Sequence, residues 1–432
     1  MSTPISIPDL HRSFLACAGT STDTRSILPG SMFFALQGPN FNANAFAGDA
    51  LSKGARYGVV DDPAVAVDER FLLVPDVLTA LQDLARHHRR KFDIPVIGIT
   101  GTNGKTTTKE LVHAVLEADR PSLATSGNLN NHIGVPLTLL RLTDEHRIAI
   151  IEMGANKVGD IAELMAIAGP THGLITNIGR AHLEGFGSYE GVITAKTEMY
   201  TYFGNHAGMV FVNADDTLLM EKSIGLKRVT YGKGGSADVR GNAAASEVPY
   251  MELVFDDRER PGHHHLTTQL IGDYNAPNAM AAVAIGQHFG VPDQQIVEAL
   301  TNYTPSNNRS QFTDTGRNQL VLDAYNANPT SMAAALENFA TMHSDRPKLV
   351  IIGDMLELGA ESGKEHRTII ALVDRLQLDA HYVGKEFAKA IDKAVTSASE
   401  LNERISAHPI NGRLILVKGS RGIELETVVP SL

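Results

Sequence analysis

The glycine-rich segment "GTNGKTTT" at residues 101–108 constrains the fold of this chain more than any other stretch of its sequence. It follows "IPVIGIT" (residues 94–100), an apolar run of strand length, and it opens "KELVHAVL" (residues 109–116), whose apolar residues have helical spacing. A glycine-rich turn that opens a helix directs backbone N–H groups and the positive end of the helix dipole at one point, where phosphate binds. The segment therefore predicts an α/β domain that binds a nucleotide.

The loop residues have separate expected roles. We expect the N–H groups of residues 102–105 to converge on the phosphates, Lys105 to reach the β- and γ-phosphates, and the Thr106 hydroxyl to bind Mg²⁺. The general P-loop pattern has a glycine where this chain has Ile99, so the match is to a variant with glycines at 98, 101 and 104. The residues predicted to contact ATP in this loop are Gly101, Thr102, Asn103, Gly104, Lys105, Thr106 and Thr107.

Residues that follow later strands are candidates for metal binding. Glu152 ends the apolar run "RIAIIE", where P-loop enzymes hold a carboxylate for Mg²⁺. His182 follows the next run, "HGLITNIGRA", and its imidazole would suit a second metal. Thr106, Glu152 and His182 are the predicted metal ligands. Lys196 stands two residues before Glu198 in "TAKTEMY", and by composition these two form a helical surface pair.

Composition limits the class of protein further. A net charge of −11 argues against nucleic-acid binding, which needs clustered Lys and Arg, and we interpret the short "HHRRK" at residues 87–91 as a solvated helix end. No apolar run is long enough to span a bilayer, so we expect no membrane insertion. Cys17 is the single cysteine, which excludes an intrachain disulfide and fits the reducing cytoplasm. We expect small-molecule partners.

The alternation of strand and helix patterns predicts three α/β domains. Residues 1–80 form a small first domain, and residues 81–308 form the central domain, with a mostly parallel sheet around the loop. The alternation restarts over residues 309–432 as an open, Rossmann-like sheet. Residues 230–270 are polar and β-like, and we expect an antiparallel extension there. The histidine run at residues 262–265 lies within it, and we interpret it as a surface loop rather than a metal site.

Several motifs, in order along nearly the whole chain, resemble the Mur ligase family. They are "GTNGKTT", "IEMG", "NIGRAHLEGFGS", "AKTEMY" and "GDYNAPNAMAA". The segments "TDTRSILPGSMFFALQG", "GNLNNHIGVPLTLL", "DAYNANPTSM", "GDMLELG" and "LVKGSRG" resemble the branch that joins D-alanyl-D-alanine to UDP-N-acetylmuramoyl-tripeptide. The "DNPR" and "DGAHNP" signatures of sister branches are absent. Ala324 stands where this branch often has serine, which leaves Asp323 in place.

The resemblance implies an ATP- and Mg²⁺-dependent amide ligase of peptidoglycan precursor synthesis that works through an acyl phosphate. It implies a UDP-sugar domain, a central ATPase domain and a C-terminal domain that closes over ATP. The catalytic residues would be Lys105, Glu152, His182 and Lys196, with Lys196 carbamylated. The further ATP contacts would be Asn275, Asn278, Arg309, Asp323, Asn326 and Asn328. The substrate contacts would be Thr24, Arg25, Asn40, Asn42, Asn128, Asn130, Asn131 and His132.

Two other interpretations stay open at this point. A nucleotide-switched binding protein would hydrolyse the nucleotide without any small-molecule acceptor, and it gives no reason for three substrate-sized domains. Another amide ligase of the same family would use a different amine. Phosphate release measured with a panel of acceptors separates the three. We expect a monomer, since nothing in the sequence requires a second copy.

Overall fold

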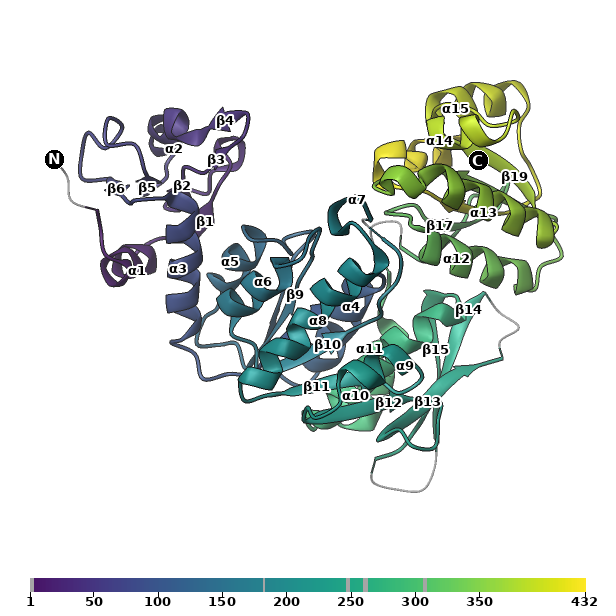
Figure 1. The fold of residues 1–432 in the computed structure, drawn as a ribbon, viewed down its shortest axis with the longest axis horizontal. Helices are drawn as coiled ribbons and strands as arrows, with labels where there is room; N and C mark the ends of the chain where they lie inside the picture. Colours follow the sequence, from purple (N-terminus) through teal and green to yellow (C-terminus); the bar gives the residue numbers. More distant parts are fainter. Residues whose placement is uncertain (1–3, 182, 246–248, 259–262, 306–308) are drawn as a thin grey trace.

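The computed structural model of the chain describes residues 4–181, 183–245, 249–258, 263–305 and 309–432. Its strands form a small sheet near the N-terminus, a large central sheet and a C-terminal sheet, and helices cover each of them (Figure 1). The α/β fold class expected from the sequence is therefore confirmed. In the described ranges, no helix is both long enough and apolar enough to cross a membrane.

The N-terminal sheet is parallel and has the strand order β1-β2-β5-β6. Its apolar residues pack on helix α2 on one side, and on the other side on α1 and α3. A short antiparallel hairpin, β3–β4, stands beside it. The strands are β1 (Thr20–Ser21), β2 (Met32–Phe34), β3 (Gln37–Gly38), β4 (Phe41–Asn42), β5 (Tyr57–Val60) and β6 (Phe71–Leu73). The helices are α1 (Ile7–Leu15), α2 (Ala47–Ser52) and α3 (Val77–Arg89).

The central sheet has nine strands in the order β15-β14-β13-β12-β11-β10-β7-β9-β8. All its pairs are parallel except β13–β14 and β14–β15, so the antiparallel extension expected over residues 230–270 is present. The strands are β7 (Val96–Thr100), β8 (Ser122–Ala124), β9 (Ile148–Glu152), β10 (His172–Ile175), β11 (Met209–Asn213), β12 (Arg228–Gly232), β13 (Val239–Ala244), β14 (Tyr250–Asp256) and β15 (His263–Ile271).

Both faces of the central sheet are covered by helices. Successive side chains of a strand point to opposite faces, and those of β9 are buried at every position, so each face needs a cover. In β9, Ile148 and Ile150 join the core beneath α4, α10 and α11, whereas Ala149 and Ile151 join the core beneath α3, α5, α6 and α8. The helices are α4 (Lys105–Glu117), α5 (Gly134–Leu139), α6 (Asp160–Ala168), α7 (Leu183–Phe186), α8 (Tyr189–Asn205), α9 (Thr217–Lys222), α10 (Ala276–His288) and α11 (Asp293–Asn302).

The C-terminal sheet has the order β16-β17-β20-β18-β19, parallel except for β16. The strands are β16 (Gln311–Asp314), β17 (Gln319–Asp323), β18 (Lys348–Gly353), β19 (Asp379–Val383) and β20 (Leu414–Lys418). The helices are α12 (Pro329–Thr341), α13 (Ser362–Arg375), α14 (Lys385–Ala390) and α15 (Ala398–Ala407). Strand β16 and helix α15 were not expected from the sequence.

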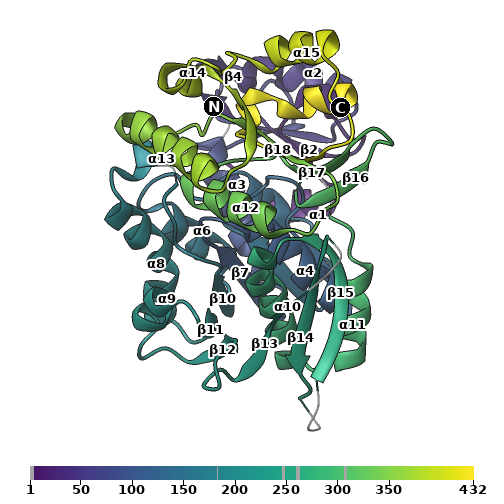
Figure 2. The same cartoon turned by 90° about the vertical axis from the view of Figure 1, so that its right-hand side faces the viewer.

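The N-terminal and C-terminal domains lie on opposite sides in Figure 1, both lie above the central domain in Figure 2, and α12 faces the central domain. Helix α3 connects the first sheet to the central one, and it runs through residue 80, where the sequence places the first boundary. The interpretation of "HHRRK" as a solvated helix end is wrong for two of its residues. His88 and Arg89 are buried, and each makes hydrogen bonds there. The ring of His88 contacts the Leu142 carbonyl oxygen, and Arg89 donates to the carbonyl oxygens of Phe92 and Ile94.

Candidate functional site

A cavity of about 1270 Å³ lies where the carboxyl ends of the central strands face the C-terminal domain. Its walls include the loop after β7, the end of β9, the start of α10, and the segments after β17 and β20. Leu78, at the start of α3, also reaches it. Ligands of open α/β sheets bind outside the carboxyl ends of the strands, which makes this cavity the candidate active site.

Two glycines shape the loop between β7 and α4. Gly101 has φ +140°, and a Cβ there would lie 2.0 Å from Thr176 Oγ1; Gly104 has φ +78°, and a Cβ there would lie 2.5 Å from Asn278 Oδ1. No other residue fits either position without moving its neighbours. Helix α4 begins at Lys105, so the N–H groups of its first turn have no intrahelical acceptor and are available to a phosphate.

One part of the expected phosphate cradle is wrong. The N–H groups of Thr102 and Asn103 do not point to a free anion position, because they donate to the carbonyl oxygen and the side-chain Oδ1 of Asn177, at 2.9 and 3.0 Å. Thr176 Oγ1 and Asn177 Nδ2 in turn donate to the carbonyl oxygen of Asn103. The segment after β10 therefore holds the backbone of the first half of the loop. The N–H groups that stay available to an anion are those at the start of α4.

Lys105 folds back over the loop. Its Nζ donates to the carbonyl oxygens of Gly101 and Thr102, at 2.8 and 2.9 Å. Burial lowers the pKa of Lys105, the nearby Glu152 carboxylate opposes this shift, and Arg309 adds to it by repulsion. An anion in the cavity would offer this ammonium group a stronger partner than two neutral carbonyl groups.

Glu152 is a buried carboxylate at the end of β9, and it lines the cavity. Its Oε1 accepts a hydrogen bond of 2.7 Å from Asn130 Nδ2, and its backbone N–H donates to Thr125 Oγ1. Its Oε2 is buried and has no hydrogen-bond partner in the described part of the chain. A buried carboxylate oxygen without a donor is costly, and a bound cation would satisfy it.

Lys196 is not the surface residue that composition indicated. It lies on α8 with 2% of its surface exposed, and its Nζ lies 5.6 Å from the ring centroid of Phe186. Glu198 does not pair with it, because Glu198 accepts hydrogen bonds from the N–H groups of Gly159 and Ala162 at the start of α6. Burial, and next the repulsion from Lys105, hold the pKa of Lys196 well below its usual value.

Asn275 and Asn278 form a buried amide chain beside the loop. Asn278 Nδ2 donates to Asn275 Oδ1 at 3.0 Å, and Thr108 Oγ1 donates to Asn278 Oδ1 at 3.1 Å. Asn275 Nδ2 donates to the Ile271 carbonyl oxygen and to Ser310 Oγ. Both asparagines line the cavity, and their bonds tie α10 to the first turns of α4.

Arg309 and Asp323 bring the C-terminal domain to the same cavity. The Arg309 guanidinium stacks 3.6 Å from the ring centroid of Tyr325, and its Nε is buried without a hydrogen-bond partner among the described residues. Arg421 lies over the same ring at 5.6 Å. Asp323 Oδ2 accepts a hydrogen bond of 2.5 Å from the buried Lys418.

Asn326 and Asn328 both line the cavity, but they differ in their contacts. The carbonyl oxygen of Asn326 accepts from Lys418 at 3.3 Å, and its side chain accepts from its neighbour's N–H group. Asn328 caps α12 together with Ser331, and its Nδ2 donates to Asn103 Oδ1 at 2.7 Å. Asn328 therefore connects the C-terminal domain directly to the phosphate loop.

The residues expected to bind the peptide and the nucleotide sugar separate into two groups. Four of them line the cavity: Asn128, Asn130, Asn131 and His132. Four others, in the first domain, do not line it: Thr24, Arg25, Asn40 and Asn42. Of these, Arg25 is exposed and pairs with Asp23, and Asn42 accepts from Asn44. His182 lies outside the described residues.

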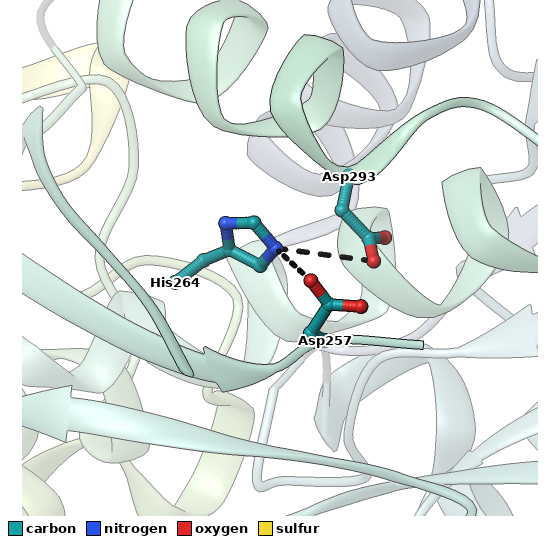
Figure 3. Close-up of side chains that lie close together, drawn as sticks. All are labelled: Asp257, His264 and Asp293. Carbon is teal, nitrogen blue, oxygen red and sulfur yellow. Dashed lines mark hydrogen bonds and ion pairs between the residues drawn. The ribbon is translucent and has the colours of Figure 1, made fainter. Parts of the chain in front are cut away.

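The histidine run is not a loop, because residues 263–265 open strand β15. Each of these histidines contacts a carboxylate across the hairpin: His263 contacts Asp256, His264 contacts Asp257, and His265 contacts Glu252. His264 Nε2 lies 3.1 Å from Asp257 Oδ2 and 3.9 Å from Asp293 Oδ2, at the start of α11 (Figure 3). The first three contacts join the two sides of the hairpin, and the His264–Asp293 contact joins the hairpin to α11 beside the edge strand of the central sheet.

Sequence reasoning missed three residues of the cavity. Lys418 and Tyr325 stand in the motifs "LVKGSRG" and "DAYNANP", but neither was singled out. A lysine in the apolar strand "RLILVK" is a signal that a buried carboxylate partner exists. Asn177, which holds the backbone of Asn103, carries no comparable signal, because its role depends on the pairing of β10 with β7.

Comparisons with known proteins agree with this geometry. The model of the Mur ligase middle domain matches residues 99–286, and that of the Mur ligase, glutamate ligase domain matches residues 308–421. The UDP-N-acetylmuramoyl-tripeptide--D-alanyl-D-alanine ligase of Escherichia coli (strain K12) is 35% identical over 98% of this chain and 95% of that protein. The ligase of the same name from Bacillus subtilis (strain 168) is 32% identical over 96% and 93%.

Solved structures give the same result. MurF from Acinetobacter baumannii superposes with a TM-score of 0.86 and 30% identity, over 100% of this chain and 99% of that one. MurF ligase from Thermotoga maritima in complex with ADP superposes with a TM-score of 0.85 and 25% identity, over 97% of each chain. The chain therefore belongs to the Mur ligase family, in its MurF group.

Proposed function

We propose that this protein is the ATP-dependent ligase that joins D-alanyl-D-alanine to UDP-N-acetylmuramoyl-tripeptide in peptidoglycan precursor synthesis. The observation that carries the proposal is that the phosphate loop, Glu152 and Asp323 of the C-terminal domain line one and the same cavity. Relatives of that name, at 32–35% identity over nearly the whole chain, support the choice of substrates. ATP and UDP-linked precursors are cytoplasmic metabolites, so we place the reaction in the cytoplasm, with a monomer as the working unit.

ATP would lie between the central and C-terminal domains. The first turn of α4 and Lys105 would hold its β- and γ-phosphates. Arg309 Nε is buried and has no hydrogen-bond partner among the residues that the structure describes, which suits a phosphate contact. Asp323 would accept from the ribose hydroxyls, and the amide chain of Asn275 and Asn278 would line the nucleotide pocket beside the loop. The T. maritima structure with ADP supports nucleotide binding by this fold.

The residues around Glu152 fit a magnesium site. Its Oε2, which has no partner among the described residues, and the Thr106 hydroxyl would hold the ion, and the metal role of His182 stays a prediction. Magnesium, when bound, neutralises the negative charge that gathers between the phosphates and the substrate carboxylate. Asn130 fixes the other Glu152 oxygen, which holds the carboxylate in one orientation.

The reaction needs two steps, because a carboxylate and an amine do not condense in neutral water. The peptide carboxylate attacks the γ-phosphorus and ADP leaves, which gives an acyl phosphate. The neutral amine of D-alanyl-D-alanine then attacks the carbonyl carbon, and the tetrahedral intermediate expels phosphate. Lys105 stabilises the charge on the transferred group during the first step. The docked C-terminal domain shields the acyl phosphate from water.

We further propose that Lys196 is carbamylated in the active enzyme. Carbamylation needs an unprotonated amine, and burial together with repulsion from Lys105 favours that form of Lys196. The product is a carbamate anion, so it would replace a buried amine by a negative charge near the Lys105 ammonium group. In the described part of the chain, no hydrogen bond holds the Lys196 amine, which leaves it available to carbon dioxide.

The peptide end of the nucleotide sugar would lie along the segment 128–132, whose asparagines and His132 line the cavity next to Glu152. The uridine end would extend toward the first domain, where Thr24, Arg25, Asn40 and Asn42 stay predicted contacts. Phosphate release with a panel of amines tests the proposal. D-alanyl-D-alanine should be the best acceptor. Release that no amine stimulates would favour a nucleotide switch, and a preference for another amine would favour a sister ligase.

A further inference from the structure

Asn103 and Asn328 form a paired amide contact between the phosphate loop and the C-terminal domain. Asn328 Nδ2 donates to Asn103 Oδ1 at 2.7 Å, and Asn103 Nδ2 lies 3.5 Å from Asn328 Oδ1. We propose that this pair is a closure contact, which couples docking of the C-terminal domain to the phosphate loop. Both asparagines are then positioning residues rather than direct nucleotide ligands. This inference rests on the ATP-dependent ligase function proposed above.

The loop side of the contact is fixed independently of the Asn103 side chain. The backbone N–H of Asn103 donates to Asn177 Oδ1, and its carbonyl oxygen accepts from Asn177 Nδ2 and Thr176 Oγ1. Within the described ranges, the side-chain amide of Asn103 has no hydrogen-bond partner other than Asn328. The backbone of Asn103 is held in place, and its side chain points to the C-terminal domain. Such a residue can make its contact only when that domain is docked against the loop.

The C-terminal side is equally fixed. Asn328 is the N-cap of α12, its Oδ1 accepts from the Ser331 N–H at 2.9 Å, and Ser331 Oγ accepts from the Asn328 N–H. Its amide therefore already has its oxygen engaged within α12 and directs its Nδ2 outward. Asn328 lies five residues after Asp323 in the chain, so the same segment carries the predicted ribose contact and the contact with the loop.

Neighbouring contacts show that the pair belongs to a docking surface. Thr330 Oγ1 accepts from the Arg180 N–H at 3.2 Å, and the Arg180 side chain lies 3.6 Å from the Glu365 carboxylate. The Glu184 N–H donates to the Glu357 carbonyl oxygen at 3.4 Å. The Arg180 contacts fall on the segment after β10 that also holds the backbone of Asn103, whereas the Glu184 contact lies on α7. Docking of α12 and the conformation of the phosphate loop are therefore linked through one short stretch of chain.

The test is a double-mutant cycle with Asn103→Ala and Asn328→Ser. Serine is as good an N-cap as asparagine, so Asn328→Ser keeps α12 capped but is too short to reach the loop. Asn103→Ala removes the side chain and leaves the backbone bonds in place. The matched control is Asn302→Ser, an exposed position at the end of α11. Ligation rates at saturating substrates and the affinity for ADP are measured for each variant.

Each single variant should lower kcat by about threefold to tenfold, the size expected for one net hydrogen bond, while the affinity for ADP changes by less than twofold. The double variant should be no worse than the poorer single variant, because the second change removes a contact that is already lost. Losses that multiply in the double variant, or a tenfold loss of ADP affinity, would mean that each asparagine contacts the nucleotide by itself, and would overturn the proposal.

Closure can also be measured without any ligation. Spin labels at Ile224→Cys and Glu403→Cys, both exposed positions, in a Cys17→Ala background report the distance between the central and C-terminal domains. With a non-hydrolysable ATP analogue, the Asn328→Ser variant should show a smaller docked population than the protein with Asn328. Equal populations would overturn the proposal. This result stands even if the ligation substrates prove to be different, so failure of the proposed function is distinguished from failure of the closure contact.

Discussion

Asp323 Oδ2 and Lys418 Nζ lie 2.5 Å apart at the carboxyl ends of the neighbouring strands β17 and β20, where the two residues are register partners. The side chain of Lys418 is 3% exposed and that of Asp323 is 17% exposed, so the pair is largely removed from water. The lysine holds the carboxylate in one orientation at the wall of the cavity. Such a group suits a substrate hydroxyl that needs a fixed acceptor.

Replacement of Asp323 by alanine is expected to raise the Michaelis constant for ATP by about tenfold or more and to lower kcat much less. A hydrogen bond to a charged group contributes roughly 1.5–3 kcal/mol, and a ribose contact is made equally in the ground and transition states. Steady-state kinetics with varied ATP measure both constants. A fall in kcat with an unchanged Michaelis constant would move Asp323 from nucleotide binding to chemistry.

Replacement of Lys105 by alanine should reduce ligation at least about 100-fold and leave the fold intact. In the proposed mechanism, the Lys105 ammonium group, which here donates to two carbonyl oxygens of the loop, would contact the transferred phosphoryl group, and loss of a preorganised donor there is costly in the transition state. Circular dichroism and kcat, compared with the exposed control Lys227→Ala, separate catalysis from folding. Near-normal turnover in a folded variant would contradict the role of the loop.

Lys196→Ala distinguishes a carbamylated lysine from a buried structural one. The variant should be almost inactive, and acetate or formate should restore part of its activity by placing a carboxylate in the vacated space. Mass spectrometry after chemical trapping of the carbamate provides an independent measurement on the unmodified sequence. A folded but inactive variant that neither acid rescues, together with no trapped carbamate, would reject the modification.

The packing of α1 on α3 should depend on pH. His11 Nε2 lies 3.0 Å from His88 Nδ1, and burial, with repulsion from His88 next, lowers the pKa of His11 from 6.5 to about 4. Between these values the unfolded chain binds a proton that the folded protein does not bind. The contribution of this histidine to the free energy of unfolding is therefore largest above about pH 6.5, and it falls as the pH drops toward 4.

Urea denaturation at pH 7.5 and pH 5.0 measures this dependence. The difference in unfolding free energy between the two pH values should be smaller in His11→Gln, which cannot titrate but keeps a polar group that can reach His88. His264→Gln, on the distant hairpin, is the matched histidine control. An unchanged difference in His11→Gln would show that the pair does not carry the effect.

Much of the fold follows from local sequence patterns. The βα alternation over residues 309–432 predicted β17, α12, β18, α13, β19, α14 and β20 in the right order, because each element carries its own apolar period. Strand β16 and helix α15 were missed. "QFTD" is half-exposed, and becomes a strand by antiparallel pairing with β17, whereas α15 follows a turn without a strong helical signal of its own.

The site was less predictable where it depends on contacts between distant segments. Glu152 and Lys105 could be found because they end a strand and open a helix next to glycines. The burial of Lys196 could not, because a lysine and a glutamate two residues apart on a helix look alike whether the helix faces solvent or a core. The pairing of Asn103 with Asn328 joins residues that are 225 positions apart, so only the assembled domains reveal it.

Transfer of an oxygen atom tests the central claim most directly. The protein is incubated with ATP, D-alanyl-D-alanine and UDP-N-acetylmuramoyl-tripeptide whose terminal carboxylate carries ¹⁸O, and the released phosphate is analysed by mass spectrometry. Because the acyl phosphate passes one carboxylate oxygen to the leaving phosphate, the account predicts one ¹⁸O atom in each phosphate released and one new amide bond for each ATP consumed. Amide formation with unlabelled phosphate would contradict the acyl phosphate, and ATP hydrolysis without any amide product would contradict the ligase function itself.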